Sequence, residues 1–302
     1  MSLIKKPKLF IVGSMTHSFA TYEDGARERF GGGVSYGGKT ASILGIPATV
    51  VTIGAEDIEP GVQELRSAGI EVWRVQRSSS NNFRNDYRGG HRKLKVSSYI
   101  KEPFLKSDFK EKPVCDFVVF FPGLHEITPE LLDVFRDKII FLDVGGLTRE
   151  LGEKNEEGLY PITQGYWKSI DGFRGKVNVL KVSHEDLENI KFGPGVTTDK
   201  EKARNLAENG FPMVLFTRGK RPTILARKGM PAIEIPVFLV EGGSEAGTGE
   251  VFSVGFIYEY FLTKDPIKAV SFGNACASYE IAKEDYNYEK AKKRAEGGEG
   301  GI

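Results

Sequence analysis

The stretch GGSEAGTGEVFSVGF at residues 242–256 decides how the rest of the chain is interpreted. Glycines and small residues lead directly into an apolar, helix-like run, and one carboxylate, Glu250, stands at the junction. Backbone N–H groups at a glycine-rich helix start bind anions, and the helix dipole adds positive potential there. A carboxylate beside such a site can accept a proton from an attacking hydroxyl. The stretch therefore predicts transfer of a phosphoryl group to an alcohol.

The composition indicates one large α/β domain in the cytoplasm. The chain has 302 residues, of which 40% are hydrophobic, enough for a sizeable core. A net charge of +1, from 42 basic and 41 acidic residues, argues against a nucleic-acid partner. No apolar run approaches the roughly 18 residues of a membrane span, and residues 1–7 lack the apolar segment of a signal peptide. Cys115 and Cys276 lie in apolar segments and are interpreted as core residues.

Apolar runs of strand length alternate with helix-like segments along most of the chain. This alternation is typical of a parallel sheet covered by helices. Strands are expected at 9–13, 48–54, 70–75, 117–121, 139–143, 178–182, 213–217, 223–226 and 232–235, and helices at 35–44, 62–68, 129–135, 185–190, 198–209, 251–262 and 266–282.

Residues 78–105 interrupt this rhythm. They are polar and alternating, and Gly89-Gly90 separates two strand-like segments, which predicts a β-hairpin. Such an insertion suggests a small β lid over an active site, built from about 14–33 and 78–105. The main domain, lid included, is expected to span residues 1–289. Residues 290–302 are charged and glycine-rich, and a flexible tail is predicted there.

The motif GVSYGGKT at Gly33–Thr40 fits the phosphate loop of P-loop NTPases letter for letter. Asp143 ends an apolar strand, as the partner carboxylate of such a loop does. A phosphate loop leaves a buried strand directly. The preceding residues 22–30 read YEDGARERF and are too charged for a central parallel strand. The P-loop NTPase is therefore kept as the lesser alternative, with Lys39 expected to be a solvated helix residue.

The order of segments over nearly the full length resembles the ribokinase-like (PfkB-type) carbohydrate kinases, near their inositol-kinase-like and nucleoside-kinase-like members. Residues 244–250 and the apolar helix after them resemble the family's Asp-Thr-x-Gly-Ala-Gly-Asp signature. Residues 31–45 resemble its Gly-Gly signature, residues 51–57 its second strand, and residues 143–149 a segment of inositol-kinase-like members. The resemblance implies an α/β fold, a three-layer α/β/α sandwich with a mostly parallel central sheet and a small β lid.

The resemblance also implies an activity. The backbone of Gly247, Thr248 and Gly249 would form the anion hole for the γ-phosphoryl group of ATP, and Glu250 would be the general base. The acceptor would be a small carbohydrate, polyol or nucleoside, and the protein a monomer or homodimer. By the same resemblance, acceptor binding falls to Ser18, Gly32, Gly33 and the lid residue Arg84, nucleotide binding to Ser183, Asp186, Thr217, Gly219 and Asn274, and Mg²⁺, through water, to Asp186.

Four positions depart from the family pattern. Glu250 replaces an aspartate, and its extra methylene shifts the carboxylate by about an ångström, enough to change the rate by about 10²-fold. Asp186 ends a Ser-x-x-Asp segment where relatives have Asn-x-x-Glu. Ser244 replaces an aspartate, which argues against a monovalent-cation site, and Ser18 replaces the sugar-binding aspartate, which argues against ribose. These departures leave open a catalytically degenerate relative that binds a ligand or regulates.

Overall fold

Long apolar runs form the centre of a large sheet in the computed structural model, which describes residues 5–88, 93–109, 111, 113–241 and 246–297. β1 and β8 are buried along their whole length, as expected for parallel strands covered on both faces. Within the described residues, nine strands make this sheet. Their spatial order is β15 (Ile233–Ile235), β14 (Arg221–Arg227), β13 (Met213–Arg218), β12 (Val179–Ser183), β9 (Ile139–Asp143), β8 (Phe117–Phe121), β1 (Leu9–Gly13), β4 (Ala48–Gly54) and β5 (Glu71–Gln76).

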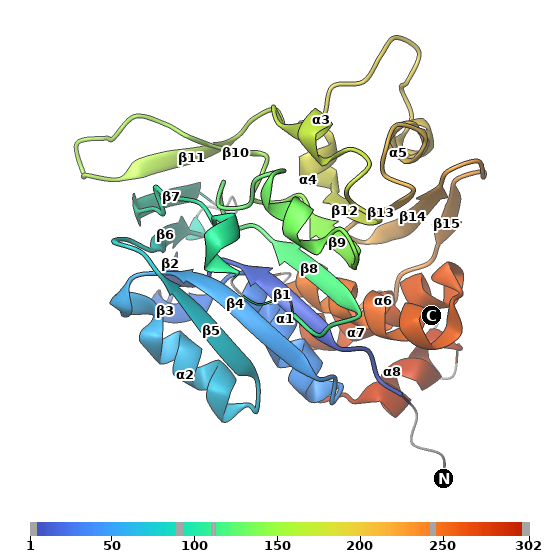
Figure 1. The fold of residues 1–302 in the computed structure, drawn as a ribbon, viewed down its shortest axis with the longest axis horizontal. Coiled ribbons are helices and arrows are strands. Elements are labelled where there is room, and N and C mark those ends of the chain that lie inside the picture. The colour runs from blue at the N-terminus through green and yellow to red at the C-terminus, as the bar shows by residue number, and fades with distance from the viewer. Residues whose placement is uncertain (1–4, 89–92, 110, 112, 242–245, 298–302) are drawn as a thin grey trace.

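Helices cover both faces of this sheet, so the fold has three layers (Figure 1). One face packs against α1 (Gly33–Ile43), α2 (Glu59–Ser67), α6 (Thr248–Thr263), α7 (Pro266–Ala282) and α8 (Tyr288–Ala295). The other packs against η4 (Leu131–Phe135), α3 (Ile170–Phe173), α4 (His184–Leu187) and α5 (Asp199–Glu208), while η1 (Glu56–Ile58) and η3 (Lys106–Asp108) are short turns. The predicted α/β fold class is confirmed.

The strand order reverses at β1. From β1 the chain goes first to β4 and β5 on one side, and then to β8, β9, β12 and β13 on the other, all in parallel. β1 and β8 approach so closely that a β-carbon on Gly13 would lie 2.1 Å from the carbonyl oxygen of Phe121. Ligands of open α/β sheets bind at the carboxyl ends of strands beside such a reversal.

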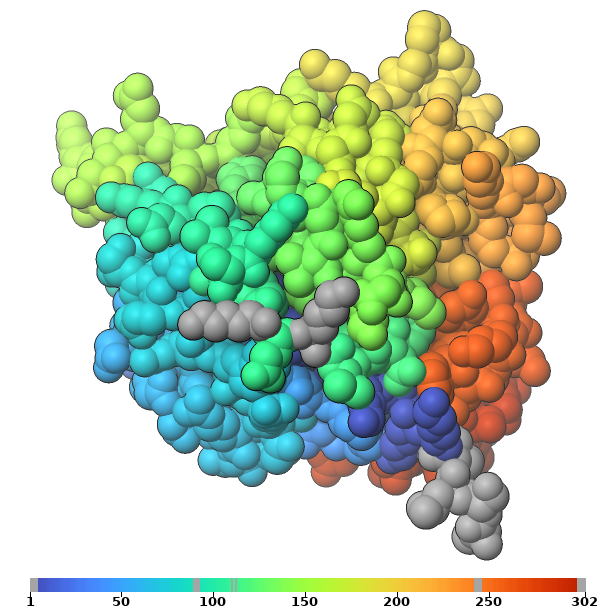
Figure 2. All heavy atoms as spheres, in the orientation of Figure 1, coloured from blue at the N-terminus to red at the C-terminus, as the bar shows by residue number. Residues whose placement is uncertain are grey.

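A second sheet, named the lid sheet here, leaves this same edge of the fold. It contains β3 (Gly25–Gly31), β2 (Thr16–Tyr22), β6 (Asn81–Asp86) and β7 (Lys93–Ser98), which come from the two predicted lid segments. β11 (Tyr160–Gln164) and β10 (Arg149–Leu151) extend it to six strands within the described residues, and their hairpin projects beyond the body (Figure 2). The sequence pattern did not predict these two strands, because they are short and lack a regular apolar alternation. The predicted turn at Gly89-Gly90 lies outside the described residues.

The prediction of a flexible tail over residues 290–302 is wrong for its first part. Residues 288–295 form α8, whose Ala291 is fully buried and whose N-cap residue Asn287 accepts a hydrogen bond from the N–H of Lys290. Tyr288 donates a hydrogen bond to Glu259 of α6. The lysine-rich run is the solvated face of an amphipathic helix.

Membrane-spanning candidates are absent from the described helices, since none combines the length and apolar composition that a bilayer crossing needs.

Candidate active site

Helix α6 begins at the carboxyl edge of the large sheet, with Gly247 at its cap position. Gly247 has a φ of 83°, in the left-handed region that favours glycine. A β-carbon there would lie 2.2 Å from the ring of Tyr36, so no other residue fits. Thr248 and Gly249 are the first helical residues. Their turn presents backbone N–H groups and the positive end of the helix dipole, which is the geometry of an anion site. Ser244 lies outside the described residues.

Glu250 follows in the first turn of α6 and reaches the start of α1. Its Oε1 lies 3.3 Å from the position of a β-carbon on Gly33, the first residue of α1. Burial raises the pKa of Glu250, and the carboxylate of Asp143 raises it further, whereas Lys181 and Arg149 lower it. The net pKa is above the usual carboxyl value. A carboxylate with a raised pKa is a stronger proton acceptor than an ordinary glutamate.

Lys181 of β12 and Asp143 of β9 form a buried ion pair next to the N-terminus of α6. Their Nζ and Oδ2 atoms are 3.0 Å apart, and the side chains are only 7% and 9% exposed. A β-carbon on Gly249 would lie 2.8 Å from Nζ. Burial lowers the pKa of Lys181, but Asp143, Asp186 and Glu250 raise it, and the net pKa is above the usual value. The lysine therefore stays charged.

The sequence-based interpretation missed Lys181, although its sequence context signals it. It interrupts the apolar strand VLKVS at 179–183, and lysine is almost never buried unless it is paired.

Ser183 ends β12 and Asp186 follows it in α4, and their side chains form hydrogen bonds within the protein. Ser183 caps α4, and Oδ2 of Asp186 accepts hydrogen bonds from the N–H and hydroxyl of Ser183. Oδ1 of Asp186 accepts one from the hydroxyl of Thr148 at 2.9 Å. The magnesium role of Asp186, through water, stays a prediction. Among the described residues, no group of three or more His, Cys, Asp or Glu side chains could hold a metal ion.

The predicted nucleotide-binding residues divide into two groups. Thr217 pairs in register with Ser183 on the neighbouring strand, and Gly219, with a φ of 59°, has open space around it. Asn274 is different, because it is buried and its amide is used within the protein. Its Oδ1 accepts from Thr223, and its Nδ2 donates to the carbonyl of Pro236, both at 2.9 Å. Asn274 therefore ties α7 to β14 and to the loop after β15.

The predicted acceptor residues Gly32 and Ser18 lie near one another, but Arg84 lies apart from them. A β-carbon on Gly32 would be 3.1 Å from Thr16, whose hydroxyl lies 3.1 Å from that of Ser18. Arg84 pairs in register with Phe19, the neighbour of Ser18, so strand alternation places Arg84 and Ser18 on opposite faces of the lid sheet. The guanidinium of Arg84 stacks 3.9 Å from the ring of Phe19.

Phe83 shares the face of Ser18, and Arg149 meets it there. Phe83 pairs in register with Ser18, and the guanidinium of Arg149 lies 5.7 Å from the centre of its ring. Arg149 also donates to the carbonyl of Gly123 at 2.5 Å. These two residues connect the lid sheet to Glu250, whose pKa Arg149 lowers.

The P-loop alternative does not fit. Gly33–Thr40 lies entirely within α1, and the strand before it, β3, belongs to the antiparallel part of the lid sheet. Helical residues cannot form the open loop that cradles a phosphate. Lys39 is exposed and its Nζ pairs with Glu64 at 3.2 Å.

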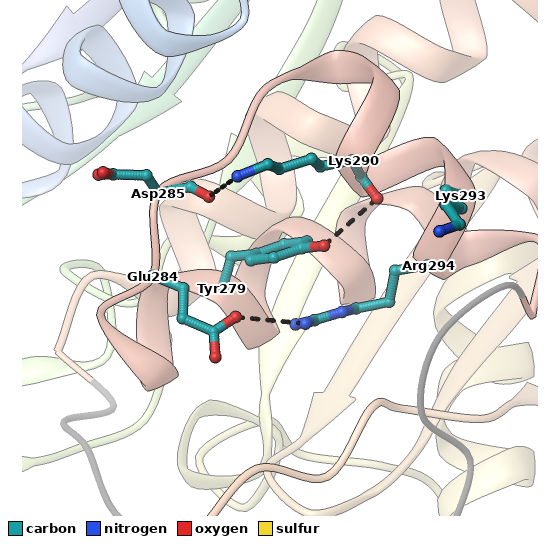
Figure 3. Close-up of a pocket in the computed structure, with 6 residues that line it drawn as sticks. All are labelled: Tyr279, Glu284, Asp285, Lys290, Lys293 and Arg294. Atoms are coloured by element: carbon teal, nitrogen blue, oxygen red, sulfur yellow. Dashed lines mark hydrogen bonds and ion pairs between the residues drawn. The ribbon is translucent and has the colours of Figure 1, made fainter.

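A separate hollow of about 460 Å³ lies where α7 meets α8 (Figure 3). Its charged groups contact one another: Arg294 pairs with Glu284 at 3.3 Å, and Lys290 donates to the carbonyl of Asp285. Arg294 also stacks 3.6 Å from the ring of Tyr279. None of the residues around Glu250 lines this hollow, so we do not assign it to the active site.

Comparisons with known proteins bear on the family and the fold. Residues 159–291 match the profile of the pfkB family of carbohydrate kinases. No curated protein matches the sequence at a significant level.

Solved structures match nearly the whole chain. One is a pyrophosphate-dependent kinase of the ribokinase family, solved with a pyrophosphate analog and myo-inositol (21% identity, 95% of this chain, 99% of that one, TM-score 0.75). Others are Arabidopsis thaliana ribokinase with ribose and ATP (14%, 96%, 99%, TM-score 0.74) and the nucleoside kinase of Methanocaldococcus jannaschii (14%, 97%, 99%, TM-score 0.71). At these identities the structures show the shared fold. The sequence match to the pfkB family thus covers residues 159–291, and the whole chain shares the fold of ribokinase-family kinases.

Proposed function

We propose that the protein transfers a phosphoryl group from ATP to a hydroxyl of a small carbohydrate, polyol or nucleoside. The observation that carries this proposal is the convergence of three elements at one edge of the sheet. The first turn of α6, the carboxylate of Glu250 and the start of α1 at Gly33 meet there, beside the lid sheet. An anion site, a base with a raised pKa and a place for an alcohol are the parts that phosphoryl transfer needs.

In this proposal, Glu250 accepts the proton of the acceptor hydroxyl. The hydroxyl oxygen then forms a bond to the terminal phosphorus of the donor, and the bond from that phosphorus to the leaving phosphate oxygen breaks. The backbone N–H groups of Gly247, Thr248 and Gly249 stabilise the negative charge on the transferring group. The longer side chain of glutamate is accommodated because Gly33 leaves space at its carboxylate.

The acceptor is proposed to be a neutral, hydroxyl-rich molecule. The lid face beside Gly32 carries the hydroxyls of Thr16 and Ser18, with the ring of Phe83 in register. Hydroxyl groups of this kind both donate to and accept from a polyol. Related structures were solved with myo-inositol and with ribose. The oligomeric state, monomer or homodimer, and the cytoplasmic location stay predictions.

Mg²⁺ stays part of this proposal, held through water by Asp186, whose carboxylate lies in α4 and accepts hydrogen bonds from Ser183 and Thr148. When bound, the ion would neutralise negative charge on the phosphoryl donor.

Pyrophosphate is a second candidate donor. The observation that favours it is Asn274, whose amide is tied to Thr223 and Pro236, so this residue is not available to a nucleotide base. The pyrophosphate-dependent kinase named above shares the fold. The anion site at α6 suits either donor, because both present a terminal phosphoryl group.

The test is a panel of inositols, sugars and nucleosides, each with ATP and with pyrophosphate, followed by detection of the phosphorylated product. We expect product with at least one pair, and its loss by about 10²–10⁴-fold in Glu250→Gln. Glu130→Gln, an exposed carboxylate change outside the site, should keep full activity. Ligand binding by calorimetry without product from any pair would favour the degenerate relative, and neither binding nor product would overturn the proposal.

A further inference from the structure

The buried ammonium of Lys181 occupies an unusual electrostatic position. Lysine is expensive to bury, and its direct partner here is Asp143, at 3.0 Å. Asp143 is shared, since its Oδ1 also accepts a hydrogen bond from the N–H of Gly145. Asp186 contributes charge from further away while its own oxygens bind Ser183 and Thr148. Among the described residues, the ammonium thus has one direct ion partner, Asp143, whose carboxylate also accepts a hydrogen bond from Gly145.

The same ammonium is pressed against the first turn of α6. Nζ lies 2.8 Å from the position of a β-carbon on Gly249, so any larger residue at 249 would displace the ammonium. The positive end of a helix dipole repels a cation. The fold nevertheless brings both sources of positive potential to one place. A multiply charged anion bound there would be stabilised by both.

We infer that the ammonium of Lys181, on β12, binds the transferred phosphoryl group. The backbone N–H groups of residues 247–249, at the start of α6, bind the same group. This inference rests on the proposed function, and it names a residue of this chain that supplies positive charge to the transferred group. The terminal phosphoryl group of ATP or of pyrophosphate carries about two negative charges, so both donors fit. In the donor-bound protein, Lys181 would be shared between Asp143 and the phosphoryl oxygens.

A purely structural role for Lys181 predicts a different result when its charge is removed. If Lys181 served only to neutralise Asp143, removal of both charges together would leave the site intact. Lys181→Met alone leaves a buried carboxylate without its partner and destabilises the fold. The double variant Lys181→Met/Asp143→Asn removes both charges and keeps similar volumes, so it is the decisive protein. Lys176→Met is the matched control, because it breaks an ion pair with Asp133 at 2.9 Å outside the site.

The experiment measures pyrophosphate binding by calorimetry and donor kinetics for the wild type, the double variant and the control. We expect pyrophosphate affinity and donor kcat/KM in the double variant to fall by roughly 10²–10³-fold, the loss typical of a removed charge-stabilising donor. The control should stay within about threefold of the wild type. Near-wild-type binding and kinetics in the double variant would overturn the role of Lys181. If the wild type binds pyrophosphate but makes no product, the proposed function fails, and the binding comparison still tests Lys181.

Discussion

Oε1 of Glu250 lies 3.3 Å from the place that a β-carbon on Gly33 would occupy, so the first turns of α6 and α1 meet without room for a side chain between them. The same β-carbon would be 2.4 Å from Cβ of Phe121, at the end of β8. Gly33 thus sets the position of Glu250 relative to the sheet. The contact joins α1, near the N-terminus of the sequence, to α6, near its C-terminus.

Gly33→Ala should therefore lower kcat strongly and the free energy of unfolding only moderately. The added methyl group must push α1 or Glu250 aside, and displacement of a reacting group by about an ångström costs about 10²-fold in rate. Crowding of Phe121 should lower the free energy of unfolding by about 1–3 kcal/mol. The measurements are kcat and the unfolding midpoint. Gly193→Ala is the control, because its β-carbon would meet nothing within 4 Å; equal effects of both changes on kcat would contradict the expectation.

Glu250→Asp tests whether the site is fitted to the longer acid. Aspartate restores the residue typical of the family, but it withdraws the carboxylate from Gly33 by about one methylene. We expect kcat to fall by about 10²-fold while donor affinity stays within a few-fold, since a base acts mainly in the transition state. An aspartate variant as active as the wild type would show that the position of the carboxylate is not fitted to glutamate.

The raised pKa of Glu250 predicts the pH dependence of the reaction. The base works when ionised, so kcat/KM should begin to fall, as the pH is lowered, at a higher pH than an ordinary glutamate would give. Lys181 lowers this pKa, so the acid limb should move to still higher pH in Lys181→Met. The pH profile of kcat/KM for both proteins is the measurement. An acid limb that moves to lower pH in the variant would contradict the assignment of Glu250 as base.

Stability should change with pH in the opposite sense to activity. In the folded protein Glu250 holds its proton more tightly than in the unfolded chain. Its contribution to stability therefore falls as the pH rises from the unfolded pKa, near 4.5, to the folded one. Glu250→Gln removes that fall and should be at least as stable as the wild type at pH 8. Denaturant unfolding at pH 5 and pH 8 checks this comparison.

The large sheet was predictable because its strands are continuous apolar runs such as LFIVG at 9–13 and FVVFF at 117–121, which have few alternative structures. The strands β10 and β11 were not, since three and five half-exposed residues carry little periodicity. The helix α8 was missed because its sequence is mostly charged and one small residue, Ala291, is its buried position, which gives little helical periodicity.

In the candidate site, local sequence features could likewise be predicted, whereas contacts between distant segments could not. Gly247, Gly249 and Glu250 could be found because a helix start is a local feature of the sequence. Tyr36 could not, since its contact with Gly247 joins distant segments. The face of Arg84 could not be predicted, because strand register decides which of two adjacent residues shares the face of Ser18.

Asn274→Ala distinguishes the two roles considered for this residue. Loss of the amide leaves the hydroxyl of Thr223 and the carbonyl of Pro236 without their partner, so the free energy of unfolding should fall by about 1–3 kcal/mol. KM for ATP should stay within about threefold of the wild type. A large rise in KM for ATP with unchanged stability would instead support the nucleotide-binding role predicted from the sequence.

Lys39→Ala tests the motif that fits the P-loop pattern best. In a P-loop enzyme this lysine contacts the phosphates, and its removal abolishes turnover. Here Lys39 lies in α1, points to solvent and pairs with Glu64, and a surface ion pair contributes about 0–1 kcal/mol. We therefore expect kcat/KM and donor affinity within about twofold of the wild type, and a change in unfolding free energy below about 1 kcal/mol. Loss of phosphoryl transfer in this variant, with the fold intact, would restore the P-loop alternative and remove Glu250 and the α6 terminus from the centre of the mechanism.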